Sequence, residues 1–313
     1  MDLIATLRDK IDALQDGEYV PGLRAVLLHV ETAFRHLSRG RKEGDETAFT
    51  DAIYRTNQAF EGSIKEAFRV LAGQDPAKMK PFEIESYLEK NGVFRARVMR
   101  QFTNYRTEWR NPSTHDYKLG FDESEAFLAI VSVTAFACLL LDEISEKLSY
   151  LKSKADTESQ QESLQKRISP SETDLVSELI RAIQEFTSRH QAVSDVSRES
   201  EAQIMGALHG FLTAALPGVQ VTTEVQLVPN RPFRVDFFLQ RGDETVILDV
   251  KRRFFRKNYQ NALAQVEHYM LLGDVKNGIL LFLPEKACEL TLEEYIVRRI
   301  GARMIILKPG DEA

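Results

Sequence analysis

The period of the hydrophobic pattern first changes near Pro217-Gly218, and this change limits the folds that the sequence can adopt. Upstream, apolar residues recur every three to four positions, which is typical of amphipathic helices. Downstream, apolar and polar residues alternate from Val219 and Val221 onward, which is typical of half-buried strands. The sequence therefore predicts an all-α N-terminal domain followed by an α/β C-terminal domain.

The first part of the chain is expected to contain helices only. Gly73 is a suitable stop for one of them. Asn111-Pro112 is expected to end another, because the residue before a proline disfavours helical geometry. The pattern predicts helices over residues 3–14, 23–37, 50–71, 81–90, 93–110 and 123–151. This first domain, residues 1–152, is thus predicted to be a helical bundle.

A polar segment and one further helix are expected between the domains, over residues 153–197. That helix has Leu175, Leu179, Ile183 and Phe186 along one stripe. The C-terminal domain, residues 198–313, is predicted to alternate helices and strands around a mixed sheet. The expected helices are 201–216, 258–272 and 292–300, and the expected strands are 219–221, 233–239, 245–250, 278–283 and 304–307.

Composition narrows the functional classes. The length of 313 residues favours two domains. Cys138 and Cys288 form no CxxC pair, so they cannot supply a four-thiolate zinc or iron–sulfur site. The apolar segment 126–141 is short for a membrane span and is expected to be buried in a core or a subunit interface. With no basic, apolar start typical of a signal peptide, a cytoplasmic location is expected.

The net charge of −6 does not by itself indicate a nucleic-acid-binding protein. The whole deficit lies upstream of Glu201, and the remainder of the chain is balanced. Local basic patches must therefore carry any argument for nucleic-acid binding.

One predicted hairpin contains the most informative group of charged residues. Gly242-Asp243 fits a two-residue turn. Counting outward from that turn, Asp236 faces Asp249 on the neighbouring strand. Two directly opposed carboxylates repel each other, and a divalent cation between them removes the repulsion. Lys251 follows Asp249 by two residues and is expected to point to the same face of the sheet.

These residue types suit metal-assisted hydrolysis of a phosphodiester. Hard carboxylate oxygens bind Mg²⁺ or Mn²⁺, and the metal lowers the pKa of a bound water. A neighbouring lysine orients or deprotonates that water and stabilises charge on the phosphate. The alternative is an exposed hairpin whose charges are merely solvated.

The hairpin resembles the PD-(D/E)XK nuclease superfamily, matching its motif at Asp236 and at Asp249-Val250-Lys251. Val235 stands where the motif name has proline, a loosely specified position in the family. The resemblance implies a Mg²⁺- or Mn²⁺-dependent deoxyribonuclease whose metal is held by Asp236 and Asp249. It also implies a glutamate ligand from the first helix of the domain, for which Glu201 is the best match and Glu199 the alternate.

A second motif lies on the next predicted helix. Gln265 and Tyr269 are four residues apart and share a helical face. They resemble the Q-x-x-x-Y motif of the RecB-like branch, which implies that Gln265 belongs to the active site and that Tyr269 binds nucleic acid. The alternative is a polar helix surface with one core tyrosine.

A basic run joins the two motifs. Directly after Lys251 it contains Arg252, Arg253, Arg256 and Lys257, with aromatic residues between them. We expect these side chains to contact the phosphate backbone of DNA without reading its sequence. The alternative is a solvated charged face.

Upstream, Arg110-Asn111-Pro112-Ser113-Thr114-His115 resembles the R-x4-6-H motif of HEPN domains, which are all-helical. The resemblance implies a ribonuclease that needs no metal and whose two motifs meet in a homodimer. In such a site Arg110 would stabilise phosphate charge and His115 would move a proton. Many HEPN domains are instead non-catalytic binding or dimerisation modules.

Together these motifs predict a two-domain nuclease of prokaryotic defence against phage or plasmids. Its expected partners are DNA, possible RNA substrates, a second copy or more of the chain, and further defence subunits. Two alternatives remain open. The helical domain is a dimerisation or sensing module in a nucleic-acid-binding protein, or the HEPN-like site is the ribonuclease and the C-terminal domain binds nucleic acid without cleaving it.

Overall fold

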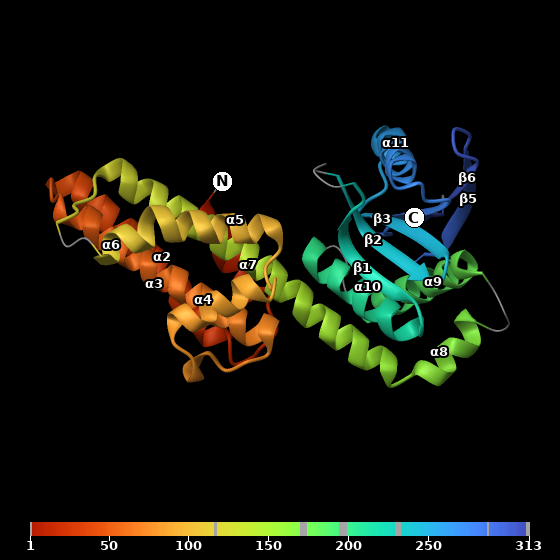
Figure 1. Cartoon of the computed structure of the whole chain (residues 1–313), viewed down its shortest axis with the longest axis horizontal. Helices are drawn as coiled ribbons and strands as arrows, with labels where there is room; N and C mark the ends of the chain where they lie inside the picture. The colour runs from red at the N-terminus through yellow and green to blue at the C-terminus, as the bar shows by residue number, and fades with distance from the viewer. Residues whose placement is uncertain are drawn as a thin grey trace. The chain divides into compact units, whose positions relative to one another are not determined.

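The computed structural model describes residues 2–115, 118–169, 174–193, 199–228, 233–286 and 288–310, without the side chains of His115 and Val193. It divides into two compact units, Met1–Leu148 and Ser149–Ala313. Figure 1 labels the elements of each. The first unit is helical and the second is built around a sheet, which confirms the predicted combination of a helical region and an α/β region.

The first unit has a core of large aromatic side chains. Phe60 is fully buried and packs against the rings of Phe102, Tyr105 and Phe136, with a centroid distance of 4.6 Å to Tyr105. The α-helices described in this part of the chain are α1 (Leu3–Asp12), α2 (Val20–Glu43), α3 (Thr47–Ala67), α4 (Pro81–Lys90), α5 (Ala96–Tyr105), α6 (Asn111–His115) and α7 (Glu123–Glu158). A π-helical turn, η1 (Phe68–Ala72), prolongs α3 to Gly73, which has a left-handed φ of 65° and ends the helix as predicted. A short 3-10 turn, η2 (Pro76–Lys78), precedes α4.

The prediction that Asn111-Pro112 ends a helix is wrong. The helix continues from α5 through a π-helical segment, η3 (Arg106–Arg110), into α6. The wider π turn accommodates a proline that has no N–H to donate. Side-chain hydroxyls bond the carbonyls nearby: Ser113 Oγ lies 2.7 Å from Trp109 O, and Thr114 Oγ1 donates to Arg110 O at 2.7 Å.

The long helix α7 is apolar enough in composition to cross a membrane, with a mean hydropathy of 2.1 over its most apolar window. Half of that window is buried inside the protein. Ala129, Ile130, Val133, Phe136 and Ala137 are among its buried residues. The segment 126–141 thus contributes to the core of the first unit, as expected for a helix that is apolar on most sides.

The second unit is a six-stranded mixed sheet with helices on both faces. Its strands are β1 (Gln220–Gln226), β2 (Arg234–Arg241), β3 (Glu244–Lys251), β4 (Asn277–Phe282), β5 (Leu290–Val297) and β6 (Ala302–Pro309), in the spatial order β1-β2-β3-β4-β6-β5. β1, β2 and β3 are antiparallel, whereas β3, β4 and β6 are parallel. One face is covered by α8 (Gln161–Ile168), α9 (Leu175–Val193) and α10 (Glu201–Ala215), and the other by α11 (Arg256–Gly273) (Figure 1).

The segment that was expected to join the domains, residues 153–197, contributes to the core of the second unit. Leu164 of α8 and Leu175, Leu179 and Ile183 of α9 are fully buried against the sheet. The stripe seen in the sequence is therefore a core-facing stripe, and residues 174–193 are an integral layer of the α/β unit.

The predicted helix over residues 292–300 is wrong. Leu290–Val297 is strand β5, paired antiparallel with β6 at the edge of the sheet. Ion pairs cross this hairpin, with Glu293 2.5 Å from Lys308 and Glu294 3.0 Å from Arg303. Strand pairing and these diagonal contacts outweigh the local helical spacing of the apolar residues.

Replacing Leu179 tests whether α9 belongs to the second unit. Leu179→Ala leaves a cavity in a fully buried layer and should destabilise that unit by about 2–5 kcal/mol. The exposed Gln184 lies on the same helix, so Gln184→Ala is the matched control and should change stability by less than about 0.5 kcal/mol. Denaturant-dependent hydrogen exchange of the β3 amides measures both, and unchanged β3 protection in Leu179→Ala would contradict the assignment.

Candidate active site

The hairpin β2–β3 has the predicted register. Gly242 has a left-handed φ of 58° in the turn, and Arg241 pairs with Glu244. The ladder continues to Phe237 opposite Leu248, so Asp236 and Asp249 are the next positions outward. At this point Asp236 Oδ2 accepts a hydrogen bond of 2.8 Å from the backbone N–H of Val250. The two aspartates therefore lie at one end of the hairpin, joined through the backbone of β3.

The strand alternation is interrupted at Asp236. Phe237 packs on the α10 side of the sheet, whereas Val235, two residues away, packs on the α11 side. Two such residues share a face in a regular strand. On the neighbouring strand, Glu224 falls opposite Asp236 and has a left-handed φ of 50°. The backbone of both strands thus rotates here, and Asp236 lies at the point of rotation.

Both carboxylates are in a poorly solvated environment. Asp249 is only 2% exposed, and burial raises its pKa, an effect that the charge of Lys251 partly offsets. Burial and the negative charge of Asp249 raise the pKa of Asp236 to about 7. The effect on Asp236 shows that the two groups are close enough to repel each other electrostatically.

Lys251 is the nearest cation. Its Nζ lies 2.6 Å from Asp249 Oδ2. Apart from this ion pair, the buried Oδ2 has no hydrogen-bond partner among the residues that the structure describes. One lysine thus lies beside two carboxylates.

A small pocket of about 200 Å³ opens beside this pair. Asp236, Lys251 and Glu201 line it, so the structure brings the predicted glutamate to the same place. Glu201 is the first residue of α10, where Ser200 and Gln203 form a capping box that sets the start of the helix. The other lining residues are Ile204, Met205, Val250, Arg252 and Leu283.

Glu199, the alternate glutamate, has other partners. Its carboxylate lies 2.6 Å from His190 Nε2, and its carbonyl oxygen accepts a hydrogen bond from Arg252. No motif or regular spacing in the sequence links His190 to Glu199. These contacts leave Glu201 as the glutamate that lines the pocket.

The donor set partly fits a divalent cation. Hard carboxylate oxygens are the right ligand type for Mg²⁺ or Mn²⁺, and the buried Oδ2 of Asp249 has Lys251 as its one partner among the described residues. Over the described parts of the chain, however, no three His, Cys, Asp or Glu side chains gather closely enough to hold a metal ion. Glu201, which is exposed, does not complete a three-carboxylate set with Asp236 and Asp249 in this arrangement.

Gln265 and Tyr269 share a face of α11, as predicted, and Gln265 Nε2 donates to Tyr269 Oη at 2.7 Å. Gln265 is exposed, but Tyr269 is only 5% exposed and belongs to the core between α11 and the sheet. Neither residue lines the pocket that Asp236 and Lys251 line. Tyr269 therefore shares a helical face with Gln265, as predicted. It is also a core residue, which was the alternative interpretation.

The four residues of the basic run after Lys251 lie in three different environments. Arg252 lines the pocket, and Arg253 forms a 2.7 Å ion pair with Glu285. Arg256 and Lys257 are exposed at the start of α11 and form no ion pair within the part of the chain that the structure describes. Arg252 is the only one of the four that lines the pocket with Asp236.

In the first unit, Arg110 is only 20% exposed and lies among acidic side chains, 3.8 Å from Glu61 and 3.7 Å from Glu85. Its Nη1 donates to Asn111, whereas its buried Nε has no hydrogen-bond partner among the described residues. Burial raises the pKa of Glu85, and the charges of Arg110 and Arg106 partly offset this. The side chain of His115 lies outside the described residues, so the structure does not place it relative to Arg110.

The comparisons with known proteins give no relative. No protein-family model matches the chain, and no curated protein or solved structure matches it.

The raised pKa of Asp236 predicts a specific pH dependence of stability in EDTA. An unfolded aspartate ionises near pH 4, whereas folded Asp236 keeps its proton until about pH 7. The free energy of unfolding should therefore fall as the pH rises through this window, by at most roughly 4 kcal/mol. Asp236→Asn should reduce this dependence, because asparagine has no proton to lose, and excess Mg²⁺ should also reduce it, because a cation favours the ionised form.

Urea denaturation across pH 4–8 measures the effect. Asp243→Asn, in the exposed turn of the same hairpin, is the control and should keep the slope of the unsubstituted protein. An identical slope in Asp236→Asn would show that Asp236 ionises normally in the folded protein.

Proposed function

We propose that the second unit is a Mg²⁺- or Mn²⁺-dependent deoxyribonuclease of the PD-(D/E)XK type. The observation that carries the proposal is the pair of poorly solvated carboxylates, Asp236 and Asp249, at one end of the hairpin with Lys251 beside them. The element order α10-β1-β2-β3-α11-β4 supports it, because that superfamily places its acidic hairpin after a first helix.

Charge balance favours a cation site over a structural ion pair. Lys251 neutralises Asp249, so ionisation of Asp236, whose pKa is about 7, leaves a negative charge without a cationic partner. Glu201 adds a further negative charge that also raises the pKa of Asp236. A purely structural pair would be balanced, since an unpaired buried charge is strongly destabilising. The excess of negative charge is therefore the property that a divalent cation would stabilise.

The chain's own residues have distinct roles in this proposal. Asp236 and Asp249 would hold the metal ion, and the N–H of Val250 keeps the Asp236 carboxylate oriented. The metal, when bound, supplies an activated water and a positive charge near the phosphate. Lys251 would orient that water and stabilise the charge that develops on the phosphate oxygens. Arg252, at the same pocket, would hold a neighbouring phosphate.

The wider proposal follows from the two motifs together. A nuclease unit joined to a HEPN-like helical unit suits a cytoplasmic enzyme of prokaryotic defence against phage or plasmids. It would act on DNA as a homodimer or larger homo-oligomer, with further defence subunits as partners.

Removing Asp249 tests the site directly. Asp249→Ala and Lys251→Ala should each abolish Mg²⁺-dependent cleavage of labelled DNA, because each removes one component of the metal-assisted reaction. In EDTA above about pH 7, where Asp236 also ionises, Asp249→Ala should be at least as stable as the unsubstituted protein, since a repulsion between buried charges is removed. Asp243→Ala, in the exposed turn of the hairpin, is the matched control and should cleave normally. Full cleavage by Asp249→Ala would reject the proposal.

A second candidate function is a metal-independent ribonuclease centred on Arg110 and His115. The observation that favours it is the buried Nε of Arg110, which has no hydrogen-bond partner among the described residues. Arg110 is also the last residue of a π-helical segment. Such segments often mark functional sites. Glu61 and Glu85 compete with phosphate for this arginine, so an RNA substrate would have to displace them.

Cleavage of RNA in EDTA separates the two candidates. A reaction that uses the substrate's own 2′-OH should proceed without metal and leave a 2′,3′-cyclic phosphate. Arg110→Ala and His115→Ala should each abolish it, whereas Asp249→Ala should leave it unchanged. Mass spectrometry of the products identifies the cyclic phosphate. If His115→Ala has no effect, or EDTA removes all RNA cleavage, the first unit is a binding or assembly module.

A further inference from the structure

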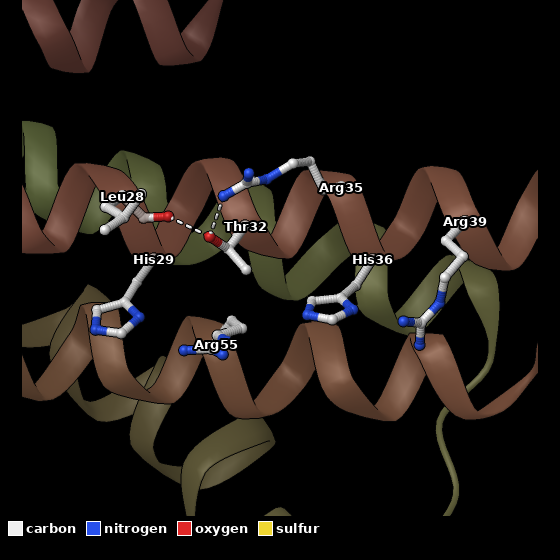
Figure 2. A pocket seen from close by; sticks show the side chains of 7 residues that line it. All are labelled: Leu28, His29, Thr32, Arg35, His36, Arg39 and Arg55. Atoms are coloured by element: carbon white, nitrogen blue, oxygen red, sulfur yellow. Dashed lines mark hydrogen bonds between the residues drawn. The ribbon is translucent and has the colours of Figure 1, made fainter.

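The first unit contains a second group of charged side chains, far along the chain from Arg110. A groove of about 490 Å³ lies between α2 and α3. Figure 2 shows its lining, which α2 supplies except for one arginine of α3. The lining residues are Leu28, His29, Thr32, Arg35, His36, Arg39 and Arg55.

Most of the basic side chains extend into the space between the two helices. In Figure 2, His29 and His36 extend from α2 toward α3, and the guanidinium of Arg55 lies between them. Arg39 also extends toward α3. Arg35 lies along α2, where its Nη2 donates to Thr32 Oγ1 at 2.7 Å.

Acidic side chains balance only part of this charge. Asp45 and Asp51 lie 3.2 Å and 2.9 Å from Arg39, and Asp51 is also 3.8 Å from His36. Arg35 and Arg55 form no ion pair with any residue that the structure describes. The groove therefore has at least two guanidinium groups whose charge the chain itself does not neutralise.

The arginines of the groove also lower the pKa of the two histidines, in addition to the larger effect of burial. Burial lowers the pKa of His29, and the charge of Arg55 lowers it further. Burial also lowers the pKa of His36, where Asp51 opposes the effect and Arg39, Arg55 and Arg35 add to it. An anion in the groove would accept hydrogen bonds from several side chains, and its negative charge would offset the positive charge of the arginines.

The size and chemistry of the groove indicate what kind of anion. Its volume lies within the range of small-molecule sites, roughly 300–1,000 Å³. Arginine binds phosphate oxygens through two parallel hydrogen bonds. No Phe, Tyr or Trp lines the groove, so a nucleobase could stack only on the imidazole rings or the guanidinium groups. From this geometry we infer that the α2–α3 groove binds closely spaced phosphoryl groups, such as those of a nucleoside triphosphate or a triphosphorylated nucleic-acid end.

The inference does not rest on the proposed nuclease, because every residue of the groove belongs to α2 or α3. It assigns a ligand-binding site to the helical unit, and the test is a binding measurement that requires no cleavage.

Titration calorimetry of the full chain in EDTA with sodium tripolyphosphate as the probe provides the test. We expect saturable binding, and Arg55→Ala should weaken it roughly tenfold or more, because a charged hydrogen-bonding partner is lost. Arg55→Lys should recover part of the affinity. Arg41→Ala is the control on α2, since Arg41 is half-exposed, is paired with Glu123 and lies outside the groove. It should bind as the unsubstituted protein does.

Two further ligands identify the source of the phosphates. ATP that binds as tightly as tripolyphosphate supports a free nucleotide. A 5′-triphosphorylated RNA oligonucleotide that binds much more tightly than ATP supports a nucleic-acid end. The inference is overturned if tripolyphosphate does not bind, if Arg55→Ala and Arg41→Ala weaken binding equally, or if a 5′-hydroxyl oligonucleotide binds and tripolyphosphate does not. Circular dichroism of each variant confirms that the helices are intact.

Discussion

The second unit has to accommodate two poorly solvated carboxylates on neighbouring strands, Asp236 and Asp249. Like charges in this position repel each other, and burial adds the cost of desolvation. Both effects make the free energy of folding less favourable. The rest of the unit must therefore offset them, and it does so with two hydrophobic cores, one on each face of the sheet. Stability supplied by α8, α9, α10 and α11 allows the end of the β2–β3 hairpin to remain electrostatically unfavourable.

The backbone beside these carboxylates is also in an unfavourable conformation. Glu224 has a left-handed φ of 50°, which is uncommon for a residue with a side chain. It lies opposite Asp236, where β2 rotates between the two faces of the sheet. A regular strand would direct Asp236 to the face that Phe238 occupies, under α11. The rotation instead brings Asp236 to the pocket at the start of α10. Backbone strain and unfavourable charge therefore coincide at one position, as is common at functional sites.

The parts of this arrangement that could be predicted from sequence are local. The register of the hairpin follows from Gly242 in the turn and from the two-residue period of the flanking strands. The spacing of Gln265 and Tyr269 gives their shared helical face and their hydrogen bond. Both conclusions need only residues within one hairpin or one helix.

The parts that could not be predicted depend on contacts between elements. Leu292, Tyr295 and Ile296 have helical spacing, but pairing with β6 makes them part of a strand. Pro112 stays within a helix because a π turn and two hydroxyl groups accommodate it. The choice of Glu201 over Glu199 depends on His190, which engages Glu199. Likewise, Arg55 joins the arginines of α2 only after α2 and α3 pack together.

The signs of the local charges distinguish the three candidate sites. At Asp236 and Asp249, negative charge exceeds positive charge, which suits a cation and through it a phosphate. Around Arg110 the balance is also negative: Arg106 and Arg110 face Glu61, Glu85 and Glu89. A phosphate approaching Arg110 would therefore meet repulsion before it reached a free donor, with no metal to offset it.

Only the α2–α3 groove has positive charge left over after its own ion pairs are counted. An anionic ligand of the helical unit should thus bind first at Arg35 and Arg55. If Arg110 acts on RNA as well, its two neighbouring glutamates must first move or take up protons. Burial already shifts Glu85 in that direction, because its pKa is raised. The electrostatics of the helical unit therefore favour binding at the groove over chemistry at Arg110 in the arrangement described here.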